Sequence, residues 1–263
     1  MNHADPWAIY VSEVMLQQTS VDRVREPWRR FLDEYPSPHA CANATLADVL
    51  NLWSGLGYPR RARNLHAAAQ MMVRDFDGRV PSAVADLRRL PGVGPYTAHA
   101  VASFAFGARV GVLDTNVGRV LARCVANNTL STADAQGLAN ALVGRAASAP
   151  VNQGLIDVGA QFCRSTPRCG DCPLRDVCRW RQDGGPDPAI RSAGVSRPQP
   201  RFEGSVRQAR GRLLAALRDG PLSVVAARRV LNAEDPEMST RVLRDLQREG
   251  LVSQHGRRVH LGS

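Results

Sequence analysis

Four cysteines lie within sixteen residues, in the stretch FCRSTPRCGDCPLRDVC: Cys163, Cys169, Cys172 and Cys178. Their spacing, Cys-x5-Cys-x2-Cys-x5-Cys, contains one close pair, whereas structural zinc sites commonly use two such pairs. Four thiolates on a short irregular loop suit a [4Fe–4S] cluster, which takes one cysteine for each iron. The spacing therefore favours a [4Fe–4S] cluster, with a zinc site and unligated thiols as the alternatives.

Two acidic residues lie where a carboxylate could take part in a reaction. Glu13 interrupts the apolar run WAIYVSEVML, and burial there would raise its pKa and let it carry a proton near neutral pH. Asp114 lies between RVGVL and TNVGRVLARC, at the N-cap position of an expected helix. A protonated acid and an ionised carboxylate can together cleave a glycosidic bond. The alternatives are a Glu13 exposed on an amphipathic helix and an Asp114 that only caps.

The segment LRRLPGVGPYTAHAVASFAFG predicts a tight turn between two helices. Its glycines, one residue apart, would let backbone N–H groups approach a ligand, and the next helix adds the positive end of its dipole. A phosphate group would fit there, although the glycines could also serve the turn alone. Arginines nearby, including those of YPRRAR at 58–63, favour a nucleic-acid backbone. The turn consists of Leu90, Pro91, Gly92, Val93 and Gly94.

The chain of 263 residues has a formal net charge of +10, and all 34 of its basic residues are arginine. This charge predicts a polyanionic partner, most commonly nucleic acid. The sequence contains neither a signal-peptide pattern nor a run of apolar residues long enough to span a membrane. We therefore expect a cytoplasmic protein in which clustered thiols hold metal. Cys41 and Cys124 are expected to be small buried hydrophobic residues.

The fold expected from the pattern is all-α. Gly and Pro separate short amphipathic segments up to about Trp180, and no strand-like alternation is sustained there. Residues 181–206 are rich in Pro, Gly and Ser and predict a linker. The pattern of residues 207–263 predicts a winged-helix-like module with three helices and a hairpin that turns at Gly256. Two interpretations of this module stay open: it binds DNA, or it is only a structural appendage. The helices expected before the linker are 8–18, 21–34, 45–53, 60–74, 82–89, 95–106, 115–126, 133–146 and 151–162.

Six motifs in order resemble the adenine DNA glycosylases of the MutY family, within the helix-hairpin-helix superfamily. They are SEVMLQQTSVDRV, LWSGLGYPRRARNLHAAA, LPGVGPYTAHAVASFAFG, VLDTNVGRVLARC, NQGLIDVGAQFC and the cysteine loop. The resemblance covers about residues 5–180, which we expect to form one glycosylase domain (1–180). It implies two α-helical lobes with a DNA cleft between them, a hairpin that grips the backbone, and a [4Fe–4S] cluster held by the four cysteines.

The resemblance also implies roles for single residues. Glu13 would protonate the adenine ring, and Asp114 would stabilise the sugar oxocarbenium ion or form a transient adduct. Tyr96 and Asn116 would line the active site, while Gln17 or Gln18 would enter the base stack as the adenine flips out of the duplex. The partner would be double-stranded DNA with a mispaired or damaged base, bound by a monomer at the bacterial nucleoid. The residues expected to contact DNA are Gln17, Gln18, Thr19, Tyr58, Arg60, Arg61, Leu90, Pro91, Gly92, Val93 and Gly94.

The chain contains no lysine, whereas strand-cutting members of the superfamily form a Schiff base with a lysine just after the hairpin. Tyr96 occupies that position, so we expect a monofunctional glycosylase acting on adenine opposite 8-oxoguanine or guanine. The family's Leu-Pro-Trp-Arg segment is missing, and a winged-helix-like segment replaces its Nudix-like tail. Two alternatives therefore stay open: a thymine or uracil glycosylase acting on T·G or U·G mispairs, and a non-enzymatic Fe–S winged-helix regulator.

Overall fold

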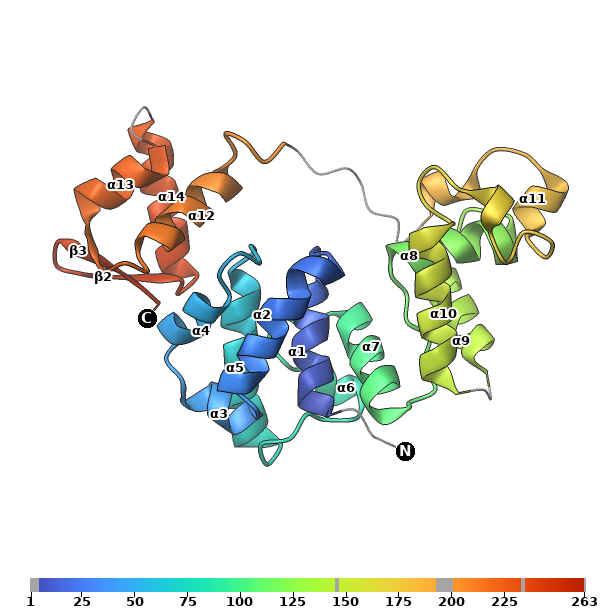
Figure 1. The fold of residues 1–263 in the computed structure, drawn as a ribbon, viewed down its shortest axis with the longest axis horizontal. Helices are drawn as coiled ribbons and strands as arrows, with labels where there is room; N and C mark the ends of the chain where they lie inside the picture. The colour runs from blue at the N-terminus through green and yellow to red at the C-terminus, as the bar shows by residue number, and fades with distance from the viewer. Residues whose placement is uncertain (1–4, 145–146, 193–200, 233–234, 263) are drawn as a thin grey trace. The chain divides into compact units, whose positions relative to one another are not determined.

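Helices make up most of the chain in the computed structural model, which describes residues 5–144, 147–192, 201–232 and 235–262 (Figure 1). The all-α expectation is confirmed, with one small sheet near the C-terminus. Residues group into two compact units. One contains 82–89 and 93–198, and the other contains 7–81, 90–92 and 199–263. Among the helices described, none has the length and apolar character needed to cross a membrane.

The first five helices surround an apolar core that includes Tyr10, Phe31, Leu65 and Met72, all fully buried. The helix α3 was not expected from the sequence, although Ser37 caps it by accepting a hydrogen bond from the Ala40 amide. These helices are α1 (Pro6–Leu16), α2 (Val21–Glu34), α3 (Pro38–Asn43), α4 (Leu46–Leu52) and α5 (Arg60–Asp75).

The other unit packs its helices around Val117, Leu121 and Ala139. The sequence predicted one helix over 115–126, but the structure has an α-helix followed by a wider π-helical turn, η1, in which Arg123 is buried. The elements of this unit are α6 (Val84–Leu87), α7 (Pro95–Phe106), α8 (Thr115–Val120), η1 (Leu121–Ala126), α9 (Thr132–Val143), α10 (Ser148–Gln161), η2 (Cys169–Asp171), α11 (Arg179–Asp183) and η3 (Pro188–Arg191).

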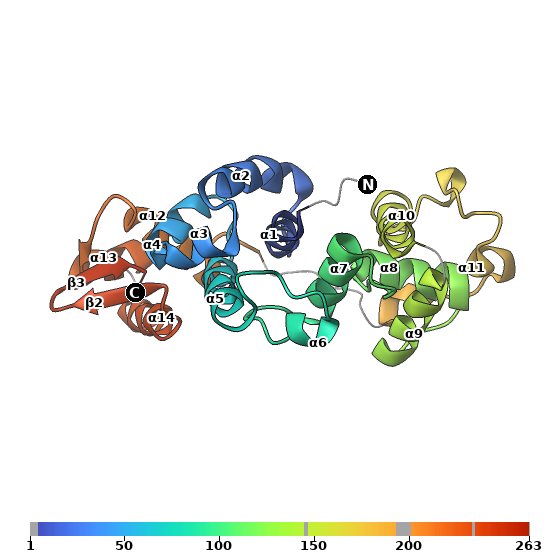
Figure 2. The same cartoon turned by 90° about the horizontal axis from the view of Figure 1, so that it is seen from below.

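The C-terminal module has three helices and a hairpin, as the sequence predicted. Figures 1 and 2 show the helices grouped beside the hairpin, and the three strands are antiparallel in the order β1-β3-β2. The two-residue strand β1 was not expected. The elements are α12 (Val206–Ala216), β1 (Leu222–Ser223), α13 (Val224–Asn232), α14 (Pro236–Arg248), β2 (Val252–His255) and β3 (Arg258–Leu261).

The expected linker, 181–206, starts as ordered structure. Asp187 pairs with the buried Arg123, and Ser192 accepts a 3.0 Å hydrogen bond from the Leu130 amide. Residues 181–192 therefore pack against the unit that holds the cysteines. The rest of the expected linker includes 193–200, which lie outside the described residues.

Candidate active site and cysteine pocket

Glu13 lies on α1, a helix that is apolar on almost every side. Only 7 % of the residue is exposed, and its neighbours Val11, Val14 and Met15 are buried as well. Of the two interpretations that the sequence left open, burial is the one found. A carboxyl group in such surroundings is costly to ionise, which suits a proton donor.

Asp114 is presented by an extended segment that α10 holds in place. Asn152, fully buried on α10, accepts a hydrogen bond from the Val112 amide at 2.9 Å and donates one to the Val110 carbonyl at 2.9 Å. The amide of Asn152 also donates to Ser103 Oγ at 2.9 Å. Asn152 thus fixes the backbone two residues before Asp114, a role that no sequence motif suggested to us.

The carboxylate of Asp114 caps α8 and accepts two hydrogen bonds. Its Oδ1 atom accepts from the Val117 amide at 2.7 Å, and its Oδ2 atom accepts from Asn116 Nδ2 at 2.7 Å. The same carboxylate can cap α8 and take part in a reaction. The two donors stabilise its negative charge, and that charge can in turn stabilise a cation that develops on a substrate. Asn116, expected to line the active site, lies directly beside the carboxylate.

Arg119 connects Asn116 to the start of the cysteine loop. Its Nη2 atom donates to Asn116 Oδ1 at 2.7 Å, and its Nε atom donates to the Cys163 carbonyl at 2.6 Å. The same Nη2 atom reaches the carbonyl of Gly159, where a Cβ would lie 2.5 Å from the Asn116 carbonyl oxygen. Only glycine therefore lets α10 approach α8 this closely. No sequence motif pointed to Arg119.

Gln18 and Tyr58, both expected to contact DNA, have left-handed backbone conformations. Their φ angles are +58° and +47°, values that non-glycine residues adopt at an energetic cost and that recur at functional sites. Gln18 is exposed and Tyr58 is half-buried, while Gln17 and Thr19 are also partly accessible. Two short loops therefore combine a strained backbone with accessible side chains.

Arg61 joins these two loops from the inside. Its guanidinium donates to the carbonyls of Met15 and Gln17 at the end of α1, at 2.7 and 2.6 Å, and to the Leu56 carbonyl at 3.1 Å. Burial lowers the pKa of Arg61 to about 10, so the side chain is still charged at neutral pH. Arg61, expected to contact DNA, is only 8 % exposed, and its guanidinium holds the backbone carbonyls of both loops.

The hairpin keeps its expected form. Gly92 has φ +78°, and a Cβ there would lie 2.7 Å from the Asn64 Nδ2 atom, so no other residue fits. Leu90 and Val93 are buried, whereas Pro91 is half-buried and the backbone of Gly94 is exposed at the start of α7. Tyr96 is half-buried in the first turn of α7. Gly92 and Gly94 are thus the exposed residues of the turn where we expect a phosphate site.

Arg60, also expected to contact DNA, pairs with the C-terminal module, and its side chain remains 64 % exposed. Its guanidinium lies 2.9 Å from Glu249 Oε1, and Arg63 donates to the Glu249 carbonyl at 2.6 Å. Arg210 of the module forms a second ion pair with the same carboxylate. Glu249 therefore docks the module on α5, and sequence spacing offered no sign of a contact so distant along the chain.

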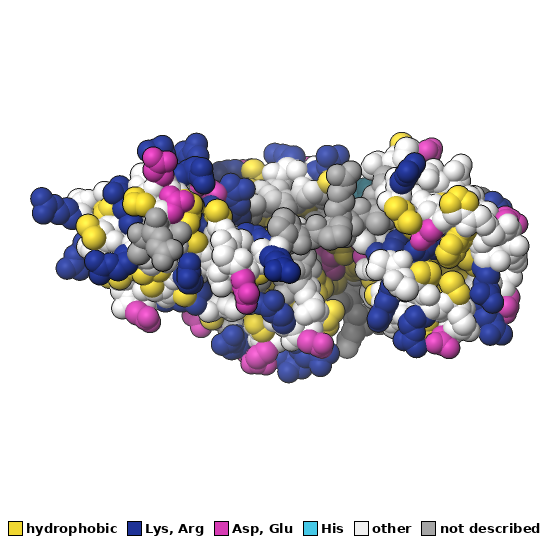
Figure 3. Space-filling view, turned by 90° about the horizontal axis from the view of Figure 1, so that it is seen from above, with side chains coloured by type: hydrophobic (Ala, Val, Ile, Leu, Met, Phe, Trp, Pro, Cys, Tyr) yellow, Lys and Arg dark blue, Asp and Glu magenta, His cyan; other side chains and the backbone are white. Residues whose placement is uncertain are grey.

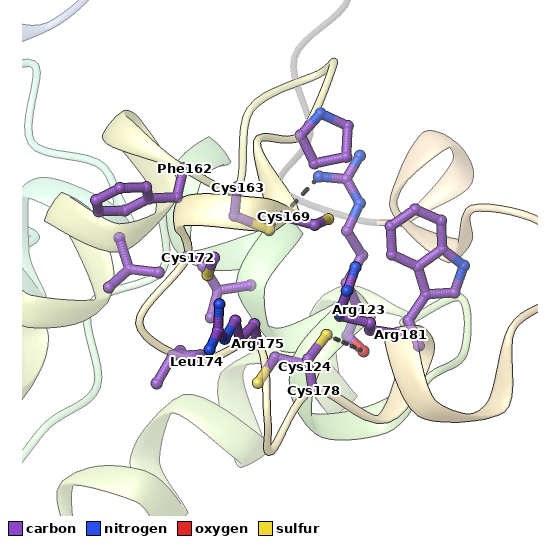
Figure 4. A pocket seen from close by; sticks show the side chains of 14 residues that line it. Arg123, Cys124, Phe162, Cys163, Cys169, Cys172, Leu174, Arg175, Cys178 and Arg181 are labelled. Carbon is purple, nitrogen blue, oxygen red and sulfur yellow. Dashed lines mark hydrogen bonds between the residues drawn. The ribbon is translucent and has the colours of Figure 1, made fainter.

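The four cysteines of the loop line one pocket (Figure 4). The remaining lining is largely apolar and includes Val158, Phe162 and Leu174. None of the six cysteines forms a disulfide, and among the described residues no three Cys, His, Asp or Glu side chains converge on a single ion. A [4Fe–4S] cluster needs no such convergence, because each cysteine binds its own iron. The donor set and the apolar lining fit such a cluster.

Two side chains of the π-helical turn η1 also reach this pocket. Arg123 donates to Cys163 Sγ at 3.5 Å (Figure 4). It also donates to the Arg164 carbonyl at 2.6 Å. Cys124 lines the pocket near Cys178, and burial together with Cys178 raises the pKa of Cys124 to about 12. Cys41 is fully buried, as expected, but Cys124 is half-buried and adjoins the loop cysteines.

Comparisons with known proteins find relatives among DNA repair proteins. Residues 11–143 match the family described as HhH-GPD superfamily base excision DNA repair protein. The adenine DNA glycosylase of Mycolicibacterium smegmatis is 43 % identical over 253 residues, covering 94 % of this chain and 84 % of the relative.

Two solved structures superpose on most of this chain. A thermostable thymine-DNA glycosylase superposes with a TM-score of 0.62 at 27 % identity, over 68 % of this chain and 85 % of that one. A trapped endonuclease III–DNA covalent intermediate superposes with a TM-score of 0.59 at 26 % identity, over 70 % and 87 % of the two chains.

Proposed function

The chain belongs to the HhH-GPD superfamily of base excision DNA repair proteins, and we propose that it is an adenine DNA glycosylase acting on adenine opposite 8-oxoguanine or guanine. Relatives that match most of the chain bear the name adenine DNA glycosylase. Their names favour adenine over thymine or uracil, and an enzyme over a non-enzymatic regulator. The net charge of +10 suits a duplex DNA substrate.

Two carboxyl groups share the chemistry. Glu13 protonates the adenine ring, which makes the base a better leaving group as the N-glycosidic bond breaks. The carboxylate of Asp114 stabilises the oxocarbenium ion that develops on the sugar, directly or through a transient adduct. Water then adds to the sugar carbon, and the products are free adenine and an abasic site.

The hydrogen bonding of Asp114 is the observation that carries this proposal. Two donors, the Val117 amide and the Asn116 side chain, hold its carboxylate at 2.7 Å each. A carboxylate fixed by donors needs little reorganisation when a cation forms beside it, and preorganisation of this kind commonly supplies a large part of an enzyme's rate enhancement. Asn116 therefore positions the charge, and Tyr96 lines the same site.

The protein holds DNA through contacts with the phosphate backbone and with the base stack. The hairpin 90–94 receives a phosphate on its exposed amides, while Gln17, Gln18, Thr19 and Tyr58 approach the base stack from their loops. Extruding the adenine costs about a few kcal/mol, less at a mispair than at a regular pair. Phosphate contacts at the hairpin offset that cost.

We assign a [4Fe–4S] cluster to Cys163, Cys169, Cys172 and Cys178. All four line one pocket, and the Arg123 guanidinium donates toward the Cys163 thiol, which suits a thiolate-bound group. When bound, the cluster cross-links the two ends of a loop that has little helical structure of its own.

The absence of lysine supports a monofunctional reaction. No lysine side chain can form a Schiff base with the opened sugar, so the abasic site is released with its strand intact. We expect the enzyme to act as a monomer in the bacterial cytoplasm, at the nucleoid.

A duplex assay tests the proposal. The full-length protein is incubated with labelled duplexes carrying A·8-oxoguanine, A·G, T·G or U·G, and each is analysed with and without hot alkali. We expect scission at the adenine pairs only, and only after alkali. Cleavage at T·G or U·G instead would show that the substrate is thymine or uracil and not adenine. Strand scission without alkali would contradict the monofunctional assignment. Binding without any excision would support a regulator.

A further inference from the structure

Two sets of arginines in the C-terminal module differ in what they contact. In the inner set, Arg218 donates to Ser54 Oγ, Arg207 donates to the Tyr58 hydroxyl at 3.4 Å, and Arg210 pairs with Glu249, the residue of the module that also binds Arg60. The outer set lies on α14 and at the β2–β3 turn, is exposed to solvent and consists of Arg241, Arg244, Arg248, Arg257 and Arg258. Docking therefore uses the inner arginines and leaves the outer set accessible. Figure 3 shows arginine side chains over the module, at the left of the view.

The helix α14 contributes three outer arginines along one stripe. Val242, Leu243 and Leu246 are buried, and α14 packs against α12 and α13. Arg241, Arg244 and Arg248 follow at spacings of three and four residues, which places them above one another on the other side of the helix. Asp245 pairs with Arg248, whose side chain is 73 % exposed, and such surface pairs are weak enough for a phosphate to compete.

The β2–β3 hairpin contributes the other two outer arginines, Arg257 and Arg258. The strands β2 and β3 end with His255 opposite Arg258, and the turn passes through Gly256 at φ +59°. His255, Arg257 and Arg258 are all exposed at this tip. A two-stranded ribbon that ends in arginines can reach a phosphate backbone beside a helix that enters a groove.

We propose that α14 and the β2–β3 hairpin form a second duplex-binding surface, with α14 in the major groove and the hairpin arginines on the phosphates. The major groove is wide enough for one α-helix, and arginine binds phosphates and base edges through paired hydrogen bonds. The inner set attaches the module that carries this surface to the segment that contains Tyr58. The inference goes beyond base excision and does not depend on which base is removed.

Binding to undamaged duplex tests this surface in the full-length protein. The variants are Arg241→Glu/Arg244→Glu and Arg257→Glu/Arg258→Glu, and the control is Arg228→Glu/Arg229→Glu, which makes the same charge change at exposed positions of α13. Fluorescence anisotropy gives Kd over a range of salt on duplexes of about one and about three helical turns. On the longer duplex we expect each test variant to bind at least about tenfold more weakly, with a salt slope smaller by about two. The control should stay within about twofold.

Two further measurements keep the result interpretable. Circular dichroism must show that the variants are folded, and Arg→Gln versions of both pairs should reproduce the loss in weaker form. Single-turnover excision at saturating enzyme should be unchanged in both test variants. If the wild type removes no adenine but the binding losses appear, the proposed function fails and this surface stands. Equal losses of duplex affinity in all three variants would overturn the proposal. Unchanged affinity in all three would also overturn it and would point to a protein partner for these arginines.

Discussion

The guanidinium of Arg119 donates a 2.6 Å hydrogen bond to the main-chain carbonyl of Cys163. The other end of the same guanidinium holds Asn116, which in turn holds the carboxylate of Asp114. One buried side chain therefore connects the first cysteine of the loop with the carboxylate that we place in catalysis. The order of the loop and the position of the carboxylate depend on each other through Arg119.

Replacing Arg119 with Gln should slow the reaction more than it weakens DNA binding. The variant loses the charged hydrogen bond that positions Asn116, worth about 1.5–3 kcal/mol, so we expect excision to fall by about tenfold to a hundredfold. Single-turnover rates and Kd for an A·G duplex separate the two effects. The control is Arg109→Gln, an exposed arginine of the same unit. A variant that excises at the wild-type rate would remove Arg119 from this connection.

Replacing Asp114 with Asn should abolish excision without unfolding α8. Asparagine caps helices about as well as aspartate, so stability should change by less than about 0.5 kcal/mol while the stabilising charge is lost. We expect the single-turnover rate to fall by at least about a thousandfold, with Kd for the duplex largely retained. Asp114→Ala is the comparison, because alanine loses the cap as well and should lower the free energy of unfolding by about 1 kcal/mol. An active Asp114→Asn variant would refute the catalytic assignment.

The sequence predicted most of the helices, Asp114 as a cap and Gly256 as a turn because these features depend on neighbouring residues. Burial of Glu13 was one of the two interpretations that the apolar residues around it left open. The contacts of Arg119 with Cys163, of Asn152 with Val112 and of Glu249 with Arg60 could not be found in this way, since these partners lie about 40 to 190 residues apart. The arginines of YPRRAR show the limit most clearly. Their charge suggested DNA contact, and the sequence did not reveal that Arg60 also pairs with Glu249 or that Arg61 is buried.

Arg61→Met should weaken both stability and DNA binding. The substitution leaves several carbonyls at the ends of the two loops without their donor, so we expect the free energy of unfolding to fall by about 2–4 kcal/mol. The strained conformations of Gln18 and Tyr58 should relax, and mispair affinity should fall more than affinity for undamaged duplex. Chemical denaturation and Kd for both duplexes measure this. Arg74→Met, at an exposed position, is the control. Equal affinity losses on both duplexes would argue against a role in loop geometry.

Cys124 and Cys172 should differ in iron binding although both line the same pocket. Cys172 belongs to the four-cysteine loop and Cys124 does not, so Cys172→Ser should lose the cluster and Cys124→Ser should keep it. Iron analysis should give about four atoms per chain for the wild type and Cys124→Ser, with absorbance near 410 nm. Stoichiometric zinc in the wild type would contradict the cluster, and iron lost equally from both variants would place Cys124 among the ligands.

Glu249 should make docking of the module depend on pH below the neutral range. Burial alone would raise its pKa, but hydrogen bonds from Arg210 and Arg60 hold the pKa of Glu249 below its ordinary value of 4.5. A carboxyl group whose pKa is lower in the folded state stabilises the fold above its unfolded pKa, and that stabilisation is lost as the pH falls through the folded pKa. Glu249→Gln should therefore lower the free energy of unfolding by about 2 kcal/mol at neutral pH. The difference from the wild type should shrink only below about pH 4.5.

The control for this pH dependence is Glu237→Gln, the same chemical change at an exposed position of α14. Denaturant unfolding of the wild type and both variants, measured from about pH 8 down to about pH 3.5, gives the difference curves. Only the Glu249 curve should be flat at high pH and fall at low pH. A Glu249→Gln protein as stable as the wild type at neutral pH would show that this carboxylate is not what holds the module on α5, and the apolar contacts beside it would then account for docking.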